Sequence, residues 1–119
     1  QVQGCGGRFR GMSVSAAGID FALELFEGLG PLSTRRMMGG LCLYRDGVIF
    51  ALLRSDGSLW LKGAGAFAAR ITAEGWERWT HARAGRRPTA MPYWRLPDAA
   101  LDDPDHACDL AREALRDLT

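Results

Sequence analysis

Apolar residues first recur at helical spacing near the start of the chain. From Ile19 to Leu29 they return every three or four positions, and acidic residues occupy positions between them. This pattern predicts an amphipathic helix over residues 15–29, with one side in a core. The side chain of Ser13 or Ser15 can cap the first turn, because a hydroxyl oxygen accepts a hydrogen bond from a free backbone amide.

Two further helices are predicted later in the chain. Residues 64–74 carry a short apolar stripe, and Gly75 can adopt the left-handed conformation that ends a helix. Near the end of the chain, Asp103 can cap a helix that begins at Pro104, where a missing amide hydrogen costs nothing. Apolar residues between positions 107 and 118 give this last helix a clear buried side.

Between the first two helices the apolar period changes to that of strands. Short apolar runs occupy residues 41–45, 48–54 and 58–62, and the pairs Asp46-Gly47 and Asp56-Gly57 separate them. Asp-Gly supplies the positive φ angles that a tight primed turn requires, so the segment predicts a three-stranded antiparallel meander. Its central run is apolar on both faces, which is typical of a middle strand covered on both sides or of a strand at an interface.

An aromatic-rich hairpin is predicted after the second helix. Residues 76–81 and 89–97 are candidate strands, and the polar, basic loop 83–88 joins them. Pro92 lies inside the second run and has no amide hydrogen to donate. It therefore indicates an edge strand or a bulge.

The element order α-β-β-β-α-β-β-α predicts an α+β fold, in which N- and C-terminal helices flank an antiparallel sheet of about five strands. A further short strand at 36–38 is an open alternative. The chain of 119 residues fits one compact domain, which we assign to residues 12–119. Residues 1–11 have no periodicity, and we interpret them as a disordered cloning or upstream-translation remnant.

Charge is segregated along the sequence. Residues 12–34 carry three acidic and no basic residues, residues 35–97 carry eleven basic and four acidic, and residues 98–119 carry two basic and seven acidic. The basic middle segment can form a local patch, or the acidic ends can neutralise it within the fold. Because no membrane-spanning run or signal peptide is recognisable, we expect a cytoplasmic protein without membrane contact.

The sequence contains no recognisable catalytic or metal signature. His81 and His106 are the only histidines, and neither stands in a nucleophile–base motif. The three cysteines lack the spacing of zinc ligands or of a disulfide framework, so we expect free thiols, no metal and no cofactor. The tryptophans either fill the core or stack on nucleic-acid bases beside arginines.

Three segments resemble a known family when they are taken in order. They are RRMMGGLCLYRDGVIFALL (35–53), LWLK (59–62) and MPYWRLPDAALDDPD (91–105). Over about residues 15–118 the chain resembles the N-terminal domain of the TfoX/Sxy family, whose fuller members are bacterial regulators of natural competence. The family motif residues are Arg35, Arg36, Met37, Gly39, Gly40, Tyr93 and Pro97.

The resemblance implies an α+β domain that acts in transcriptional regulation without known catalysis. The sequence departs from the family pattern at three places: Met38 and His81 stand where an aromatic residue is common, and Arg86-Arg87 stands where Gly-Lys is usual. The helical second domain of the fuller regulators does not follow in this sequence, so a stand-alone adaptor is an alternative.

We therefore expect a non-enzymatic bacterial regulatory domain that binds a protein partner. A homodimer and a weak or indirect DNA contact are further expectations, and arginines would then contact phosphate rather than bases. These candidate contacts are Arg35, Arg36, Arg83, Arg86 and Arg87.

Two alternatives to this function stay open. One is an interaction module with no nucleic-acid role. The other is a small-ligand-binding protein or minor enzyme, with its pocket between the sheet and the helices near Cys42, His81 and Tyr93. For the RRMMGG segment we expect the two glycines to permit a bend or bulge, and Met37 or Met38 to pack inward.

Overall fold

The structure is a computed structural model that describes residues 14–37, 39–81, 85 and 87–119. The expected remnant at 1–11 and the alternative cap Ser13 lie outside the described residues. The described helices are α2 (Ala16–Leu25), the 3₁₀ helix η1 (Glu27–Leu29), α3 (Gly65–Ala73), α4 (Asp98–Leu101) and α5 (Pro104–Leu118). None of these helices is long and apolar enough to cross a membrane. The described strands are β1 (Ser33–Met37), β2 (Gly40–Arg45), β3 (Val48–Leu53), β4 (Leu59–Lys62), β5 (Arg78–His81) and β6 (Thr89–Arg95).

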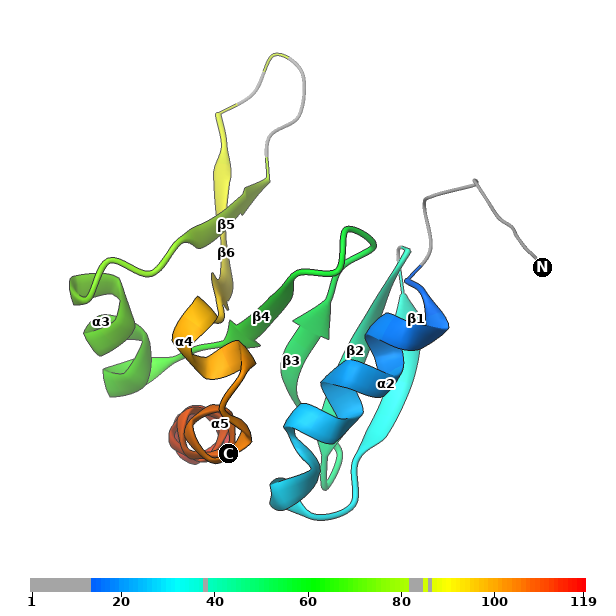
Figure 1. The fold of residues 1–119 in the computed structure, drawn as a ribbon. Helices are drawn as coiled ribbons and strands as arrows, with labels where there is room; N and C mark the ends of the chain where they lie inside the picture. Colours follow the sequence, from blue (N-terminus) through cyan, green and yellow to red (C-terminus); the bar gives the residue numbers. More distant parts are fainter. Residues whose placement is uncertain (1–13, 38, 82–84, 86) are drawn as a thin grey trace.

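The six strands form one antiparallel sheet in the order β1-β2-β3-β4-β6-β5 (Figure 1). The predicted α+β fold is confirmed. The sheet has one strand more than the expected number of about five, because β1 forms a regular edge strand beside β2. Every described side chain of β1 is exposed, so this segment lacks the apolar alternation by which a strand is predicted.

The two Asp-Gly turns of the meander differ. At Asp46 and Gly47 both φ angles are positive, 51° and 79°, which confirms the predicted tight primed turn between β2 and β3. The connection from β3 to β4 is longer, since the Arg54 amide donates to the Ser58 carbonyl at 2.9 Å. Only Gly57 of the second pair has a positive φ angle, 88°, so the tight primed turn is wrong there.

The aromatic hairpin is confirmed, but β6 is an inner strand that pairs with both β4 and β5. The edge-strand interpretation of Pro92 is therefore wrong. The pairing of β5 with β6 shifts between Arg78 and Thr80, which lie opposite Trp94 and Ala90. Pro92 falls within this irregular stretch, as the bulge alternative predicts.

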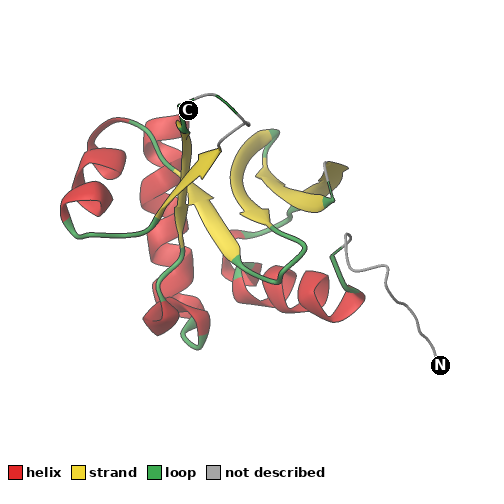
Figure 2. Ribbon diagram, turned by 90° about the horizontal axis from the view of Figure 1, so that it is seen from above, coloured by secondary structure: helices red, strands yellow, loops and turns green. Residues whose placement is uncertain are grey.

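The helices and one face of the sheet share the main core. Buried residues of α2, α3 and α5 form one cluster with Leu43, Phe50 and Leu61 of the strands. Phe26 and Phe50 are fully buried, and their rings meet edge to face at 5.3 Å. Figure 2 shows the helices gathered on one side of the sheet. Within the described residues, the opposite face of the sheet is left without a layer of helices.

The C-terminal helix begins where the sequence predicts and also supports α3. The Asp103 side chain caps α5 by accepting a hydrogen bond from the His106 amide at 3.2 Å. The α3 helix has no side-chain cap of its own, and Asp117 of α5 accepts a hydrogen bond from the Phe67 amide at 2.8 Å. A carboxylate stabilises this end of α3, because the first amides of a helix are free and carry partial positive charge.

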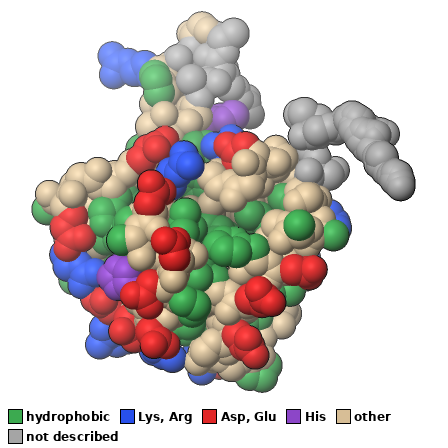
Figure 3. Space-filling model, in the orientation of Figure 1, with side chains coloured by type: hydrophobic (Ala, Val, Ile, Leu, Met, Phe, Trp, Pro, Cys, Tyr) green, Lys and Arg blue, Asp and Glu red, His purple; other side chains and the backbone are tan. Residues whose placement is uncertain are grey.

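The side of the molecule that carries the helices is acidic. Seen from this side, acidic side chains surround a central apolar area (Figure 3). The exposed carboxylates on this side include Asp20 and Glu24 of α2, Asp98 of α4 and Asp105 of α5. The charge segregation along the sequence thus becomes a segregation in space, with acidic residues concentrated on the covered side of the sheet.

Candidate binding face

The uncovered face of the sheet carries a separate cluster of apolar and aromatic side chains. Cys42, Leu52 and Trp60 form its buried centre and lie side by side on β2, β3 and β4. Partly buried residues surround this centre: Tyr44, Ile49, Trp79 and Tyr93. We call these seven residues the aromatic face. None of them belongs to a helix, so the strands alone position this surface.

A β-bulge explains how β3 serves both faces of the sheet. The register of β2 and β3 shifts after Leu43, so that Leu43 lies opposite Ala51 but Tyr44 lies opposite Ile49. Phe50 is the extra residue, and it joins Ala51 in the main core. The bulge returns Ile49 to the aromatic face, because one inserted residue inverts the alternation of a strand.

A chain of hydrogen bonds holds the ring of Trp60. The indole Nε1 donates to Ser58 Oγ at 2.8 Å, and Ser58 Oγ donates to Asp56 Oδ1 at 2.5 Å. Asp56 Oδ1 also accepts from the Ser58 amide at 2.9 Å. The buried indole therefore has its polar partner, as buried tryptophans generally require, and the second Asp-Gly pair functions here as a support for Trp60.

The aromatic rings pack against one another at an angle. The Trp79 ring is tilted by 53° to Tyr93 and by 48° to Trp60, with centroid distances of 5.7 Å and 6.2 Å. The Arg54 guanidinium lies over the Trp79 ring at 4.7 Å and over the Trp60 ring at 5.8 Å. Such cation–π contacts stabilise the arrangement, and they also occupy ring faces that a base would need for stacking.

Cations border the aromatic face. Arg35, Lys62 and Arg95 lie opposite Cys42, Tyr93 and Trp60 in neighbouring strands. Residues opposite each other in antiparallel strands project to the same side of a sheet, so these three cations share the face with Arg54. The nearby acids are already engaged: Asp56 with Ser58, and Glu77 with Arg95 at 3.8 Å.

The acidic ends of the chain neutralise little of this charge. Among the described residues, the Arg70–Glu113 pair is the ion pair that joins the basic middle segment to an acidic end. The other pairs join neighbours within one segment, as Arg112 does with Asp109. Of the cations of the aromatic face, Arg95 is paired with Glu77, whereas Arg35, Arg54 and Lys62 take part in no ion pair among the described residues and are available for a partner.

Two titratable groups of the aromatic face, Tyr93 and Cys42, have raised pKa values. Burial raises the pKa of the Tyr93 hydroxyl, and the neighbouring Cys42 and Tyr44 raise it further. Burial also raises the pKa of the Cys42 thiol, although Arg35 opposes this effect. At neutral pH the Tyr93 hydroxyl is consequently a hydrogen-bond donor beside several cations.

Acid should weaken the support of Trp60. The hydrogen bonds from Ser58 lower the pKa of Asp56 below its ordinary value of 3.8. A lowered pKa contributes stability above the unfolded-state value, and that contribution is lost as the pH falls through the folded-state value. We expect the free energy of unfolding of Asp56→Asn to depend less steeply on pH than that of the wild type between about pH 4 and 2. Urea titrations across this range measure both slopes, and equal slopes would contradict the assignment.

The structure separates the arginines that the sequence nominates as a site. Arg35 and Arg36 lie next to each other on the edge strand β1. Arg87 is exposed next to β6, near the opposite edge of the sheet. Arg83 and Arg86 lie outside the described residues. The described members therefore form no single patch.

Removing both β1 arginines should leave the fold intact. Both side chains are exposed, and substitutions at such positions usually change stability by less than about 0.5 kcal/mol. We expect Arg35→Ala combined with Arg36→Ala to keep its free energy of unfolding within about this margin in a urea titration. A loss of several times this size would show that the arginines are structural ion-pair partners.

The motif residues occupy three different environments. Gly39, with a φ angle of 80°, follows β1, and Gly40 begins β2 in a buried position. Met37 is 42% exposed, so inward packing is wrong for Met37, and Met38 lies outside the described residues. Tyr93 belongs to the aromatic face, and Pro97 precedes α4 as its N-cap.

The small-ligand pocket expected between sheet and helices is wrongly placed. Cys42 and Tyr93 lie together, but on the face that points away from the helices. His81 is exposed on β5.

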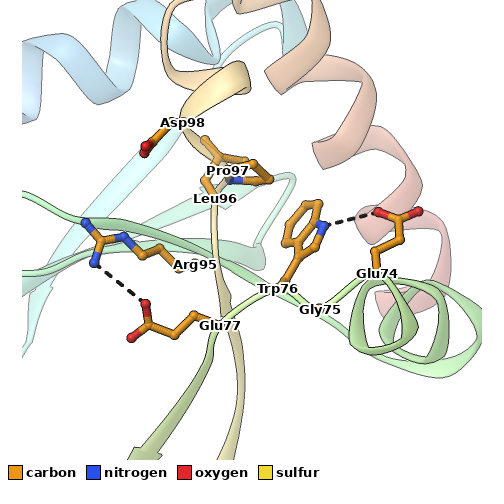
Figure 4. Close-up of a pocket in the computed structure, with 8 residues that line it drawn as sticks. All are labelled: Glu74, Gly75, Trp76, Glu77, Arg95, Leu96, Pro97 and Asp98. Atoms are coloured by element: carbon orange, nitrogen blue, oxygen red, sulfur yellow. Dashed lines mark hydrogen bonds and ion pairs between the residues drawn. The ribbon is translucent and has the colours of Figure 1, made fainter.

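A cleft of about 540 Å³ lies elsewhere, between the end of α3 and the start of α4 (Figure 4). Two pairs of side chains interact within it: Trp76 Nε1 donates to Glu74 Oε1 at 3.1 Å, and Arg95 forms an ion pair with Glu77 at 3.8 Å. The cleft therefore lies where the end of α3 packs beside the start of α4, and its interactions support the fold.

Sequence reasoning missed Arg54, Tyr44 and Ile49 as parts of a surface. A signal was present in the central run of the meander, whose two apolar faces allow either a second cover or an interface. Choosing between these requires the positions of the helices, which the strand pattern does not contain.

An α+β domain with one open sheet face is the class that this geometry defines. Comparison with protein families matches residues 24–118 to the TfoX N-terminal domain. The chain belongs to this family and is a TfoX-type regulatory domain. A comparison with curated protein sequences found no significant match.

Proposed function

We propose that this domain is a non-enzymatic regulator that acts through a protein partner bound at the aromatic face, in transcriptional control of the competence type in the bacterial cytoplasm. The single observation that supports this proposal most is the uncovered cluster around Trp60, bordered by cations. Contiguous apolar and aromatic surface rimmed by polar groups marks interaction sites in soluble proteins.

We propose protein binding rather than catalysis because of the kinds of side-chain group that the aromatic face offers. The described aromatic face offers hydroxyl, thiol, guanidinium and ammonium groups, and burial holds Tyr93 and Cys42 in their protonated forms. General acid–base catalysis needs a group that changes protonation near the operating pH. Recognition of a partner needs only fixed donors and apolar area.

The proposed association with DNA is indirect. Strong binding to the phosphate backbone requires several cations placed along one surface. Arg35 and Arg36 lie at one edge of the sheet and Arg87 near the other. Of the cations on the aromatic face, Arg54 is stacked on Trp79 and Arg95 is paired with Glu77. A partner protein is therefore proposed to carry the DNA contact.

Capture of partners from the native cell, with and without nuclease, tests this function. Trp79→Ala should remove captured proteins while the fold persists, because Trp79 is a partly buried member of the aromatic face. Trp76→Ala is the matched control, since Trp76 is partly buried against the main core instead. Circular dichroism checks the fold of both variants. The proposal fails if Trp79→Ala unfolds the domain, if both variants capture the same proteins, or if nuclease abolishes all capture.

A further inference from the structure

We infer that the partner presents an acidic segment with apolar side chains to the aromatic face; this inference rests on the proposed function and specifies the chemistry of its ligand. The face combines two features. Ile49, Trp79 and Tyr93 supply partly exposed apolar area around its buried centre. Arg35, Arg54 and Lys62 supply positive charge around that area.

The hydrogen-bonding groups of the face favour carboxylates and backbone carbonyls. Guanidinium and ammonium groups are donors without acceptor capacity. Tyr93 adds a hydroxyl that its raised pKa keeps protonated. Among the described residues, the nearby carboxylates are already engaged, Asp56 by Ser58 and Glu77 by Arg95. A partner segment rich in aspartate and glutamate would therefore find mainly hydrogen-bond donors for its carboxylates on this face.

Ring geometry distinguishes this ligand from a nucleic acid. Single-stranded nucleic acids bind by stacking bases on exposed ring faces. Here Arg54 covers Trp79, and the rings of Trp79, Tyr93 and Trp60 are tilted against one another. Three rings tilted to one another present no set of parallel faces on which successive bases stack. Carboxylates need no such faces, because they pair with the cations around the rings.

Charge also distinguishes the ligand from a second copy of the same face. Two aromatic faces packed together would bring two sets of cations, Arg54 and Lys62 among them, into one interface. Like charges opposed at an interface suppress association. A homodimer would therefore have to use another surface, and the aromatic face is left for a partner of opposite charge.

Selection from two random pools tests the inference directly, because it requires no isolated partner. The probes are a displayed library of random 16-residue peptides and a pool of random single-stranded DNA, each selected on the whole chain. The peptides that bind wild type should be enriched at least about twofold in Asp and Glu over the input library, and also in Leu, Ile or Phe.

Charge variants then locate the binding site. Arg54→Gln combined with Lys62→Gln should weaken binding of the selected peptides by about tenfold, because both half-buried side chains would lose an ion pair with the peptide. Arg36→Gln combined with Arg116→Gln is the matched control. Arg36 lies opposite the core residue Leu41 and Arg116 lies on α5, so neither borders the aromatic face, and this variant should bind as wild type does.

Each other outcome overturns the inference in a recognisable way. Selected peptides without acidic enrichment, or equal losses in both double variants, would show that charge at this face does not choose the ligand. Enrichment of DNA without acidic peptides would assign the face to nucleic acid. If cellular capture still depends on Trp79 in these cases, the proposed protein-binding function stands and only the acidic chemistry fails. If capture also becomes independent of Trp79, both fail.

Discussion

Gly40→Val is expected to lower the free energy of unfolding by at least about 3 kcal/mol, a large part of the roughly 5–15 kcal/mol that stabilises a typical domain. Gly40 is buried at the start of β2. A Cβ atom at this position would lie 2.8 Å from the Leu53 carbonyl oxygen. That oxygen belongs to the backbone of β3, so the clash can be relieved only by displacing a central strand. Urea denaturation followed by circular dichroism measures the loss.

A matched pair of alanine variants separates this clash from the general cost of replacing glycine. Gly75 has a φ angle of 87° and no atom within 4 Å of an added Cβ. Gly75→Ala should therefore cost about 1–2 kcal/mol through backbone strain alone. Gly40→Ala should cost more than Gly75→Ala, although the Gly40 backbone is unstrained. The reverse order would mean that β2 and β3 are not in such close contact at this point.

Phe50→Ala should be the most damaging single truncation in the core, with a loss of about 3–5 kcal/mol. The Phe50 side chain has no exposed surface, and it packs edge to face against the equally buried Phe26. Because Phe50 is the extra residue of the β3 bulge, truncation leaves a cavity at the point where the bulge anchors the sheet to the helices. Thermal and urea unfolding give the change in stability.

Phe21→Ala is the matched control for this prediction. Phe21 is 43% exposed on α2, and its removal should change stability by less than about 1 kcal/mol. A similar loss for both variants would contradict the assignment of Phe50 to the core and Phe21 to the surface. Binding of the selected acidic peptides to Phe21→Ala should equal that of wild type, since α2 lies on the other side of the sheet.

Local patterns predicted most of the fold. The first helix, the meander and the C-terminal helix depend on spacings within about ten residues, and Asp103 and Asp46-Gly47 perform the local roles expected of them. The sequence predicts the strand β1 only as a short alternative, because every residue of this edge strand is exposed. Hydrogen bonding to β2 holds β1 in the sheet, and this pairing leaves no apolar period in the sequence. For Pro92 the bulge alternative holds and the edge-strand alternative does not, since a proline shows that a ladder is interrupted but not whether another strand lies beyond it.

The aromatic face required tertiary structure. Its members come from β2 to β6 and meet only through strand pairing. The sequence of β3 is apolar at every position, so it predicts that both faces of this strand are shielded from water. Which face receives the helices, and where the register shifts, depends on contacts between residues far apart in the chain.

By itself, the sequence determined the helices, the meander, the family resemblance and the separation of acidic ends from a basic middle. These features depend on residues close together in the chain, whose order and spacing the sequence gives directly. Only the tertiary structure decided that the helices all cover one side and that Arg54, Trp79 and Tyr93 share the other. The physical reason is that a strand has two faces, and the packing of distant elements chooses which of them is left to bind a partner.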